Sequence, residues 1–321
     1  MQTVFLVGPT AVGKSAIALE LARRIGAEIV SADSMQVYRG MDIGTAKPTA
    51  ADRARVPHHL IDVCDVSDVF DAKQFVELAT KAIAGIHGRD HVALVVGGTG
   101  LYVRALRGGL FEGPSRNDEV RARLEKMDAA QLFEELRRVD PLTAGRIDRH
   151  NPRRLVRALE VFYGTGKPIA ELQRQWGVGQ ASRLSNETAG NRRDACSTGV
   201  CLSRERDDLR ARIERRVDAQ IADGWVEEVR QLLARGLERN ATAMQAAGYW
   251  ELVAHVRGEL SLDEAVALIK TRTRQLAKRQ LTWFRREPQL EWVEIGRDEP
   301  PTDTATRVLG IAQQREKNLA R

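Results

Sequence analysis

Residues 8–15 form the pattern Gly-x-x-x-x-Gly-Lys-Ser, whose residue types and spacing suit the binding of a polyphosphate. The two glycines let the backbone wrap closely, so that successive N–H groups can point at phosphate oxygens. Lys14 adds a positive charge, Ser15 offers a hydroxyl for Mg²⁺, and the N-terminus of the following helix adds partial positive charge. The residues of this predicted phosphate loop are Gly8, Pro9, Thr10, Ala11, Val12, Gly13, Lys14 and Ser15. The alternative is a turn that only joins a strand to a helix, but the apolar run before it and the helix formers after it favour phosphate binding.

Two further polar residues follow apolar runs that we interpret as buried strands. Asp33 comes after the run at 28–31, and Thr99 lies in Gly97-Gly98-Thr99-Gly100, after the run at 92–96. Ligands of open α/β sheets bind beyond the C-terminal ends of the strands, so Asp33, Thr99 and the phosphate loop are expected to face one crevice. Two alternatives remain open, namely a helix cap or turn role for Asp33 and a plain glycine turn around Thr99.

Two other segments contain candidate functional residues. Residues 40–48 have neither a helical nor a strand pattern, and such loops often carry function, although a passive connection is the alternative. His58 and His59 are adjacent, which is a poor arrangement for binding one metal ion, because neighbouring side chains on a regular element point in different directions. We therefore expect a structural or loop role for this pair.

Basic residues point to a polyanionic partner. The net charge is +6, and cations alternate with Gln and aromatic residues at 273–285, a mixture that suits RNA. Arg153, Arg154 and Arg157 share one predicted helix and could contact phosphates. A solvated helix face is the alternative for the three arginines, and a core helix with its arginines outward is the alternative for the C-terminal segment.

The expected elements define an α/β fold in which a parallel sheet has helices on both faces. We predict strands at 4–7, 28–31, 92–96, 200–202 and 292–295, and helices at 16–25, 204–223, 225–235 and 263–285. Between them the pattern predicts helices only, at 117–125, 129–139, 141–147 and 152–163. The predicted organisation is therefore a core of residues 1–109 and 199–321 with a helical insertion at 110–198. Residues 177–199 have a loop composition.

The composition excludes other classes of protein. With 321 residues and 43% hydrophobic residues the chain can form a large core, and no apolar run is long enough to cross a membrane. The N-terminus has no signal-peptide pattern. Three cysteines, Cys64, Cys196 and Cys201, form no C-x-x-C pair, which argues against a disulfide framework or a zinc site. We therefore expect a cytoplasmic protein with no membrane partner.

Taken together, these segments resemble the tRNA dimethylallyltransferases of bacterial type, also called tRNA isopentenyltransferases. The resemblance rests on GPTAVGKS at 8–15, DSMQVYRGMDIGTAKP at 33–48, PHHLID at 57–62, GGTGLYVRAL at 97–106, NPRRLVRALEV at 151–161, GYWEL at 248–252 and TRQLAKRQLTWFRR at 273–286. These segments stand in the family's order and span most of the chain. The fold implied is the parallel sheet of the P-loop NTPases. Arg153 stands where Gln is usual, Ala247 where Ile or Val is usual, and 180–198 matches no known segment.

The resemblance implies transfer of a dimethylallyl group from dimethylallyl diphosphate to N6 of the adenosine on the 3′ side of the tRNA anticodon. The phosphate loop would hold the diphosphate, helped by Arg206 or Arg212, with Mg²⁺ as cofactor at Ser15. Asp33 would be the general base, and Lys14 and Thr99 further catalytic residues. The implied tRNA contacts are Asp33, Ser34, Met35, Gln36, Thr99, Arg121, Arg153, Arg154, Leu155, Val156, Arg157, Arg274 and Lys278. The partner is the anticodon stem-loop, and the enzyme is expected to act as a monomer.

Three rival functions remain. A small-molecule kinase could use the same phosphate loop with ATP, and an adenylate isopentenyltransferase could prenylate free AMP or ADP. An RNA-binding regulator that has kept the fold is the rival that is not an enzyme. The long insertion and the basic C-terminal segment favour tRNA over free nucleotides, and the complete phosphate loop argues against the regulator.

Overall fold

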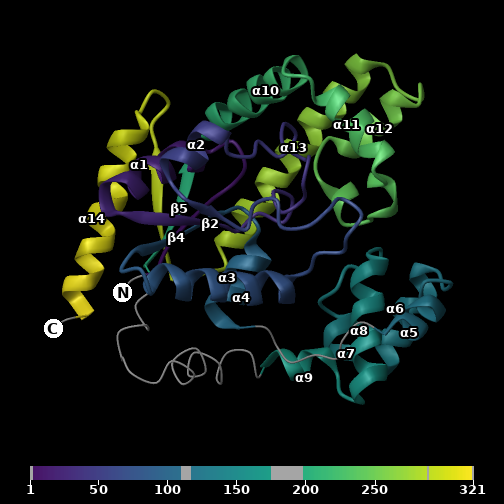
Figure 1. Ribbon diagram of the computed structural model, residues 1–321. Helices are drawn as coiled ribbons and strands as arrows, with labels where there is room; N and C mark the ends of the chain where they lie inside the picture. The colour runs from purple at the N-terminus through teal and green to yellow at the C-terminus, as the bar shows by residue number, and fades with distance from the viewer. Residues whose placement is uncertain (1–2, 110–116, 175–197, 288, 320–321) are drawn as a thin grey trace. The chain divides into compact units, whose positions relative to one another are not determined.

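The computed structural model describes residues 3–109, 117–174, 198–287 and 289–319, which belong to two compact units (Figure 1). Unit 1 consists of residues 1–106 and 191–321, and unit 2 of residues 107–190. The predicted loop at 177–199, including Cys196, lies outside the described residues except for its last two positions, which belong to a strand.

Unit 1 is built around a parallel sheet, which confirms the predicted fold class. Its described strands are β1 (Thr3–Val7), β2 (Ala27–Ser31), β3 (His58–His59), β4 (Val92–Gly97), β5 (Thr198–Arg204) and β6 (Leu290–Ile295), in the order β3-β2-β4-β1-β5-β6. β3 was not predicted from the sequence, because two residues are too short for a periodic pattern. Thr198 was predicted to lie in the insertion, whereas it pairs with Val4 at the start of β5.

Two hydrophobic cores cover the two faces of this sheet, because successive side chains of a strand point to opposite faces. Val4 and Leu6 of β1 pack into one core with α1 (Lys14–Ile25) and α14 (Pro301–Leu319). Phe5 and Val7 pack into the other with α3 (Ala72–His87) and α4 (Gly100–Gly108). The remaining helices of unit 1 are α2 (Ala50–Arg55), α10 (Arg206–Ala222), α11 (Trp225–Ala234), α12 (Tyr249–Val256) and α13 (Leu262–Phe284), with 3₁₀ turns at Leu237–Arg239 and Ala243–Gln245.

The described residues of unit 2 form helices, and the first four of these helices each begin at a polar residue that binds the first free N–H groups. They are α5 (Asp118–Leu124), α6 (Ala129–Val139), α7 (Pro141–Ala144), α8 (Pro152–Thr165) and α9 (Ile169–Arg174). Asn117, Asp128, Asp140 and Asn151 are the caps of the first four. Leucines spaced along α6 and α8 form a separate small core. Helix α9 was not predicted from the sequence.

Across the part of the chain that the structure describes, no helix combines the length and the apolar composition that crossing a membrane requires.

Candidate active site

The phosphate loop begins directly after β1 and ends in the first turn of α1, which contains Lys14 and Ser15, as the pattern predicts. Lys14 Nζ donates hydrogen bonds to the carbonyl oxygens of Gly8, at 3.0 Å, and of Pro9, at 2.7 Å. Burial lowers the pKa of Lys14 to about 8, while the negative charge of Asp33 acts in the opposite direction. The side chain is therefore a desolvated cation within the electrostatic reach of Asp33.

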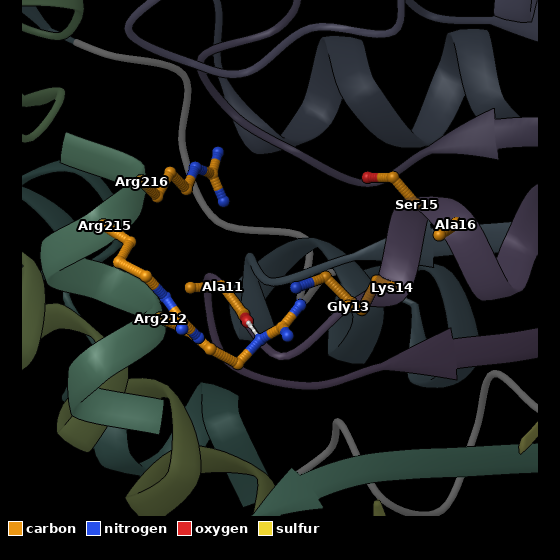
Figure 2. A pocket seen from close by; sticks show the side chains of 8 residues that line it. All are labelled: Ala11, Gly13, Lys14, Ser15, Ala16, Arg212, Arg215 and Arg216. Carbon is orange, nitrogen blue, oxygen red and sulfur yellow. Dashed lines mark hydrogen bonds between the residues drawn. The ribbon is translucent and has the colours of Figure 1, made fainter. Parts of the chain in front are cut away.

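A pocket of about 310 Å³ opens in front of this loop, and three arginines of α10 line it. Figure 2 shows Arg212, Arg215 and Arg216 extending from one helix, with the Ser15 hydroxyl on the opposite side. Arg212 Nε donates to the Ala11 carbonyl at 3.0 Å, and Arg216 Nη1 donates to Thr10 Oγ1 at 3.4 Å. The pocket presents side-chain cations and backbone N–H groups, which is the chemistry needed to bind an oxyanion.

The two arginines proposed from the sequence differ in their positions. Arg212 lies in the pocket, whereas Arg206 is the exposed first residue of α10 and does not line it. Sequence reasoning missed Arg215 and Arg216. Burial lowers the pKa of Arg216, and the charge of Asp33 again opposes this shift. The helical spacing of Arg212 and Arg216, four residues apart, was the available signal, because such residues share one helix face.

Asp33 and Thr99 come together at the ends of β2 and β4. Thr99 Oγ1 accepts a hydrogen bond from Ser34 N at 3.1 Å, and Thr99 N donates to the Ala32 carbonyl at 3.3 Å. A Cβ atom on Gly97 would lie 2.1 Å from the Ala32 carbonyl oxygen, so only glycine permits this close approach.

The Asp33 side chain closes a tight turn with one of its two oxygens. Oδ1 accepts from Met35 N at 2.9 Å and from Gln36 N at 3.4 Å. Within the described part of the chain, Oδ2 has no hydrogen-bond partner. The turn role that was left open is therefore present, and it orients a carboxylate that keeps one oxygen for another partner.

Two of the other predicted nucleic-acid contacts, Gln36 and Arg274, have side-chain partners inside unit 1. The amide of Gln36 accepts from Ser31 Oγ at 3.0 Å and donates to the carbonyl oxygens of Thr45 and Ala46 at 3.3 Å each, so it holds the loop at 40–48. Arg274 Nη1 pairs with Glu214 Oε1 at 2.9 Å. Lys278 is exposed on α13, and Ser34 and Met35 are half-buried beside Asp33.

The predicted contacts in unit 2 divide into buried and exposed residues. Leu155 and Val156 are 0% and 4% exposed in the core of the unit, so the prediction that their side chains contact tRNA is corrected. Arg157 and Arg121 face the buried carboxylate of Glu160, at 2.8 and 3.7 Å. Arg153 and Arg154 are exposed at the first turn of α8 and remain available to a partner.

The loop at 40–48 and the histidine pair have structural contacts. Lys47 Nζ is buried between Asp42 Oδ1, at 2.5 Å, and Asp62 Oδ1, at 2.6 Å. His59 Nε2 lies 2.7 Å from Glu28 Oε2, and His58 Nδ1 lies 2.7 Å from the Val56 carbonyl oxygen. The described residues contain no group of three or more His, Cys, Asp or Glu that could hold a metal ion.

Gln280, which was not predicted from the sequence as a site residue, connects the phosphate loop to the glycine turn that carries Thr99. Gln280 of α13 accepts a hydrogen bond from Thr10 N at 2.8 Å and donates one to the Gly98 carbonyl at 3.0 Å. It lies within the 273–286 segment, but its partners are 270 and 182 residues away in the sequence.

The whole chain is similar to known prenyl transferases. The family model described as IPP transferase matches residues 36–287. The tRNA dimethylallyltransferase of Geobacter metallireducens is 50% identical over 295 residues, which cover 91% of this chain and 92% of that protein. The enzyme of the same name from Desulforudis audaxviator is 43% identical over 320 residues, 97% of each chain.

Solved structures agree with the sequence comparison. The tRNA isopentenylpyrophosphate transferase of Bacillus halodurans matches with a TM-score of 0.69 and 36% identity, over 100% of this chain and 99% of the other. A eukaryotic dimethylallyltransferase acting on tRNA matches with a TM-score of 0.72 and 26% identity, over 98% of this chain and 77% of the other. The resemblance drawn from the motifs is thereby confirmed, and this chain belongs to the IPP transferase family of enzymes.

Proposed function

We propose that this chain transfers the dimethylallyl group of dimethylallyl diphosphate to N6 of the adenosine on the 3′ side of the tRNA anticodon, and releases diphosphate. The observation that carries the proposal is a cationic phosphate loop within the electrostatic reach of an oriented carboxylate. Burial lowers the pKa of both Lys14 and Arg216, and the negative charge of Asp33 raises it against this effect. Membership of the IPP transferase family supports this reaction over the others that such a site would allow.

The phosphate loop holds the leaving group in this proposal. As the bond from the prenyl C1 to the diphosphate oxygen breaks, negative charge grows on the diphosphate. Lys14, Arg212 and Arg216 lie around the pocket where that charge develops, and fixed cations in a desolvated site stabilise it strongly. We propose Arg216, and not Arg206, as the second arginine that binds the diphosphate. Arg216 lines the pocket and donates a hydrogen bond to Thr10, whereas Arg206 does not line the pocket.

Asp33 accepts the proton that the amine must lose. The lone pair of an exocyclic adenine amine is delocalised into the ring, so N6 is a weak nucleophile until a base takes one of its protons. N6 forms the bond to the prenyl C1, and its proton passes to Asp33 Oδ2, while Oδ1 stays bound to Met35 N. Thr99, held against Ser34 beside Asp33, offers a hydroxyl to the incoming base.

The residues present fit a Mg²⁺ ion. This ion prefers oxygen ligands, and it is usually held by one or two protein groups with substrate phosphates and water completing its shell. Ser15 supplies one exposed hydroxyl at the edge of the pocket. When bound there, the ion would neutralise charge on the diphosphate.

The RNA side of the reaction needs the adenosine to leave the stacked anticodon loop, because a base inside the stack cannot bring N6 to Asp33. Arg153 and Arg154 of unit 2 and Lys278 of α13 are exposed cations suited to the stem-loop phosphates. We further propose that the enzyme works as a monomer in the cytoplasm, where its tRNA substrate is found.

The test is transfer of radiolabel from dimethylallyl diphosphate to an anticodon stem-loop RNA in the presence of Mg²⁺. We expect incorporation that disappears when the adenosine 3′ to the anticodon is changed. Label on AMP or ADP instead would support the adenylate isopentenyltransferase. ATP consumption without prenyl transfer would support the kinase.

The general base is tested with Asp33→Asn. The amide oxygen of Asn can still accept the hydrogen bonds of Met35 and Gln36, so the turn and RNA affinity are expected to survive. Turnover is expected to fall by about 10²- to 10⁴-fold, since Asn cannot take a proton. Asp223→Asn, at an exposed position after α10, is the matched control. Unchanged turnover in Asp33→Asn would rule out the assignment.

A further inference from the structure

We propose that Gln280 is a positioning residue that fixes the phosphate loop relative to the turn carrying Thr99, and so sets the distance between the donor diphosphate and Asp33. This inference rests on the proposed function. It adds a role for a residue of α13 whose side chain faces the site, while neighbouring Lys278 and Arg279 face solvent.

The Gln280 amide continues the hydrogen bonding of the sheet where the sheet itself has ended. β1 and β4 are paired as far as Val7 and Gly97. Beyond these residues the two chains diverge, one into the phosphate loop and the other into the turn before α4. Gln280 Oε1 binds Thr10 N at 2.8 Å and Nε2 binds the Gly98 carbonyl at 3.0 Å, so one side chain joins both.

The packing around Gly98 shows how closely the side chain is held. A Cβ atom on Gly98 would lie 2.5 Å from Gln280 Nε2, and one on Gly100 would lie 2.2 Å from the Trp283 ring. Two residues of α13 therefore lie directly on the glycine turn, in space that any larger residue in the turn would occupy. These glycines permit the approach of α13, and Gln280 uses it to make two directed contacts.

The two contacts require one group that both accepts and donates. A primary amide has an acceptor oxygen and a donor NH₂ group at the same end of the side chain. Glu has acceptor oxygens but no NH₂ group, and Met has neither. In Gln280→Glu the acceptor for Thr10 N would remain, but a carboxylate oxygen would face the Gly98 carbonyl oxygen. In Gln280→Met the volume would be nearly kept and both hydrogen bonds lost.

The contacts also link the donor site to the general base. Gly98 precedes Thr99, and Thr99 Oγ1 binds Ser34 N beside Asp33. On the other side, Thr10 precedes Ala11, whose carbonyl is held by Arg212. Loss of the Gln280 amide would let the loop and the turn drift apart, and a misplacement of about 1 Å can cost about 10²-fold in rate.

The experiment compares the unchanged chain with Gln280→Met and Gln280→Glu, and with Gln313→Met at an exposed position of α14 as the control. Turnover at saturating dimethylallyl diphosphate and stem-loop RNA, RNA affinity and melting temperature are measured for each. We expect turnover to fall by about 10²-fold in both Gln280 variants, with RNA affinity and melting retained. Gln313→Met is expected to match the unchanged chain.

Unchanged turnover in Gln280→Met, or a loss no larger than its unfolded fraction, would overturn the positioning role. Failure of the unchanged chain to transfer label would instead contradict the proposed function. Calorimetry with inorganic diphosphate then tests the positioning role of Gln280 independently of the reaction. Weaker diphosphate binding by Gln280→Met than by the unchanged chain would support the proposal that Gln280 positions the phosphate loop, and equal binding would contradict it.

Discussion

At the scale of single residues, the candidate site holds a desolvated cation within the electrostatic reach of a carboxylate. Lys14 has a pKa of about 8 because burial removes water from its ammonium group, and Asp33 limits that shift. The lowered pKa means that the folded chain releases this proton more readily than the unfolded chain does. The free energy of unfolding therefore gains a contribution as the pH rises from about 8 toward the ordinary value of 10.5.

Donor binding should have the opposite dependence on pH. Below about pH 8 Lys14 is charged and, in the proposed reaction, would attract the diphosphate; above about pH 8 this charge is lost. We expect kcat/KM for dimethylallyl diphosphate to fall as the pH rises through about 8. The arginine of Lys14→Arg keeps its charge at every accessible pH. We expect this variant to be less active, and its kcat/KM should not fall as the pH rises through about 8. A pH profile of kcat/KM that is the same for both proteins would contradict the assignment.

At the scale of elements, a buried carboxylate joins β2 to the edge of the sheet. Glu28 is 4% exposed, and Arg89 binds it through Nε at 3.0 Å and Nη2 at 2.7 Å. His59 of β3 and His91, before β4, complete the group at 2.7 and 2.9 Å. These hydrogen bonds, those from Arg89 above all, lower the pKa of Glu28 to about 2. A strand of two residues is thus held partly by side chains.

Glu28→Gln is expected to reduce the free energy of unfolding by about 2 kcal/mol at pH 7, since hydrogen bonds to charged groups contribute at that level. A lowered carboxyl pKa stabilises the fold fully above the unfolded value of 4.5, and this stabilisation is lost as the pH falls toward 2. Urea denaturation at pH 7, 4 and 3 should show that the difference in the free energy of unfolding between the unchanged chain and Glu28→Gln becomes smaller as the pH falls. Glu227→Gln, in an exposed pair with Arg230, serves as the control. A difference in the free energy of unfolding between the unchanged chain and Glu28→Gln that does not change with pH would contradict this account.

At the scale of the whole molecule, the net charge of +6 and the exposed arginines predict binding to RNA that depends on salt. Not every arginine contributes equally. Arg121 and Arg157 face Glu160 within unit 2, whereas Arg153 and Arg154 are exposed at the start of α8. The second pair is the part of this helix that can release counterions from a phosphate backbone.

The double variant Arg153→Ala/Arg154→Ala should weaken stem-loop binding and lower the slope of log affinity against log salt by about 1.4 to 1.8 in magnitude. KM for dimethylallyl diphosphate should not change. Arg137→Ala/Arg138→Ala is the matched control, because these exposed arginines of α6 are paired with Glu134 and Glu135. Titrations at several salt concentrations measure the slopes, and an equal slope in both double variants would count against the contact.

Local pattern was enough to predict much of this protein. The apolar runs predicted five strands, the glycines and Lys14 predicted a phosphate loop, and the motifs together predicted the family. Each of these signals lies within a few residues of the chain, where the spacing of side chains and the geometry of strands and helices act directly.

Only the tertiary structure decided which residues meet. It brought Arg216 to Thr10, turned Leu155 and Val156 into a core, and placed Gln280 between Thr10 and Gly98. β3 has two residues and exists because β2 offers it a partner. Such contacts join residues up to 270 positions apart, so they depend on the path of the whole chain and on the close approach that Gly97 and Gly98 allow.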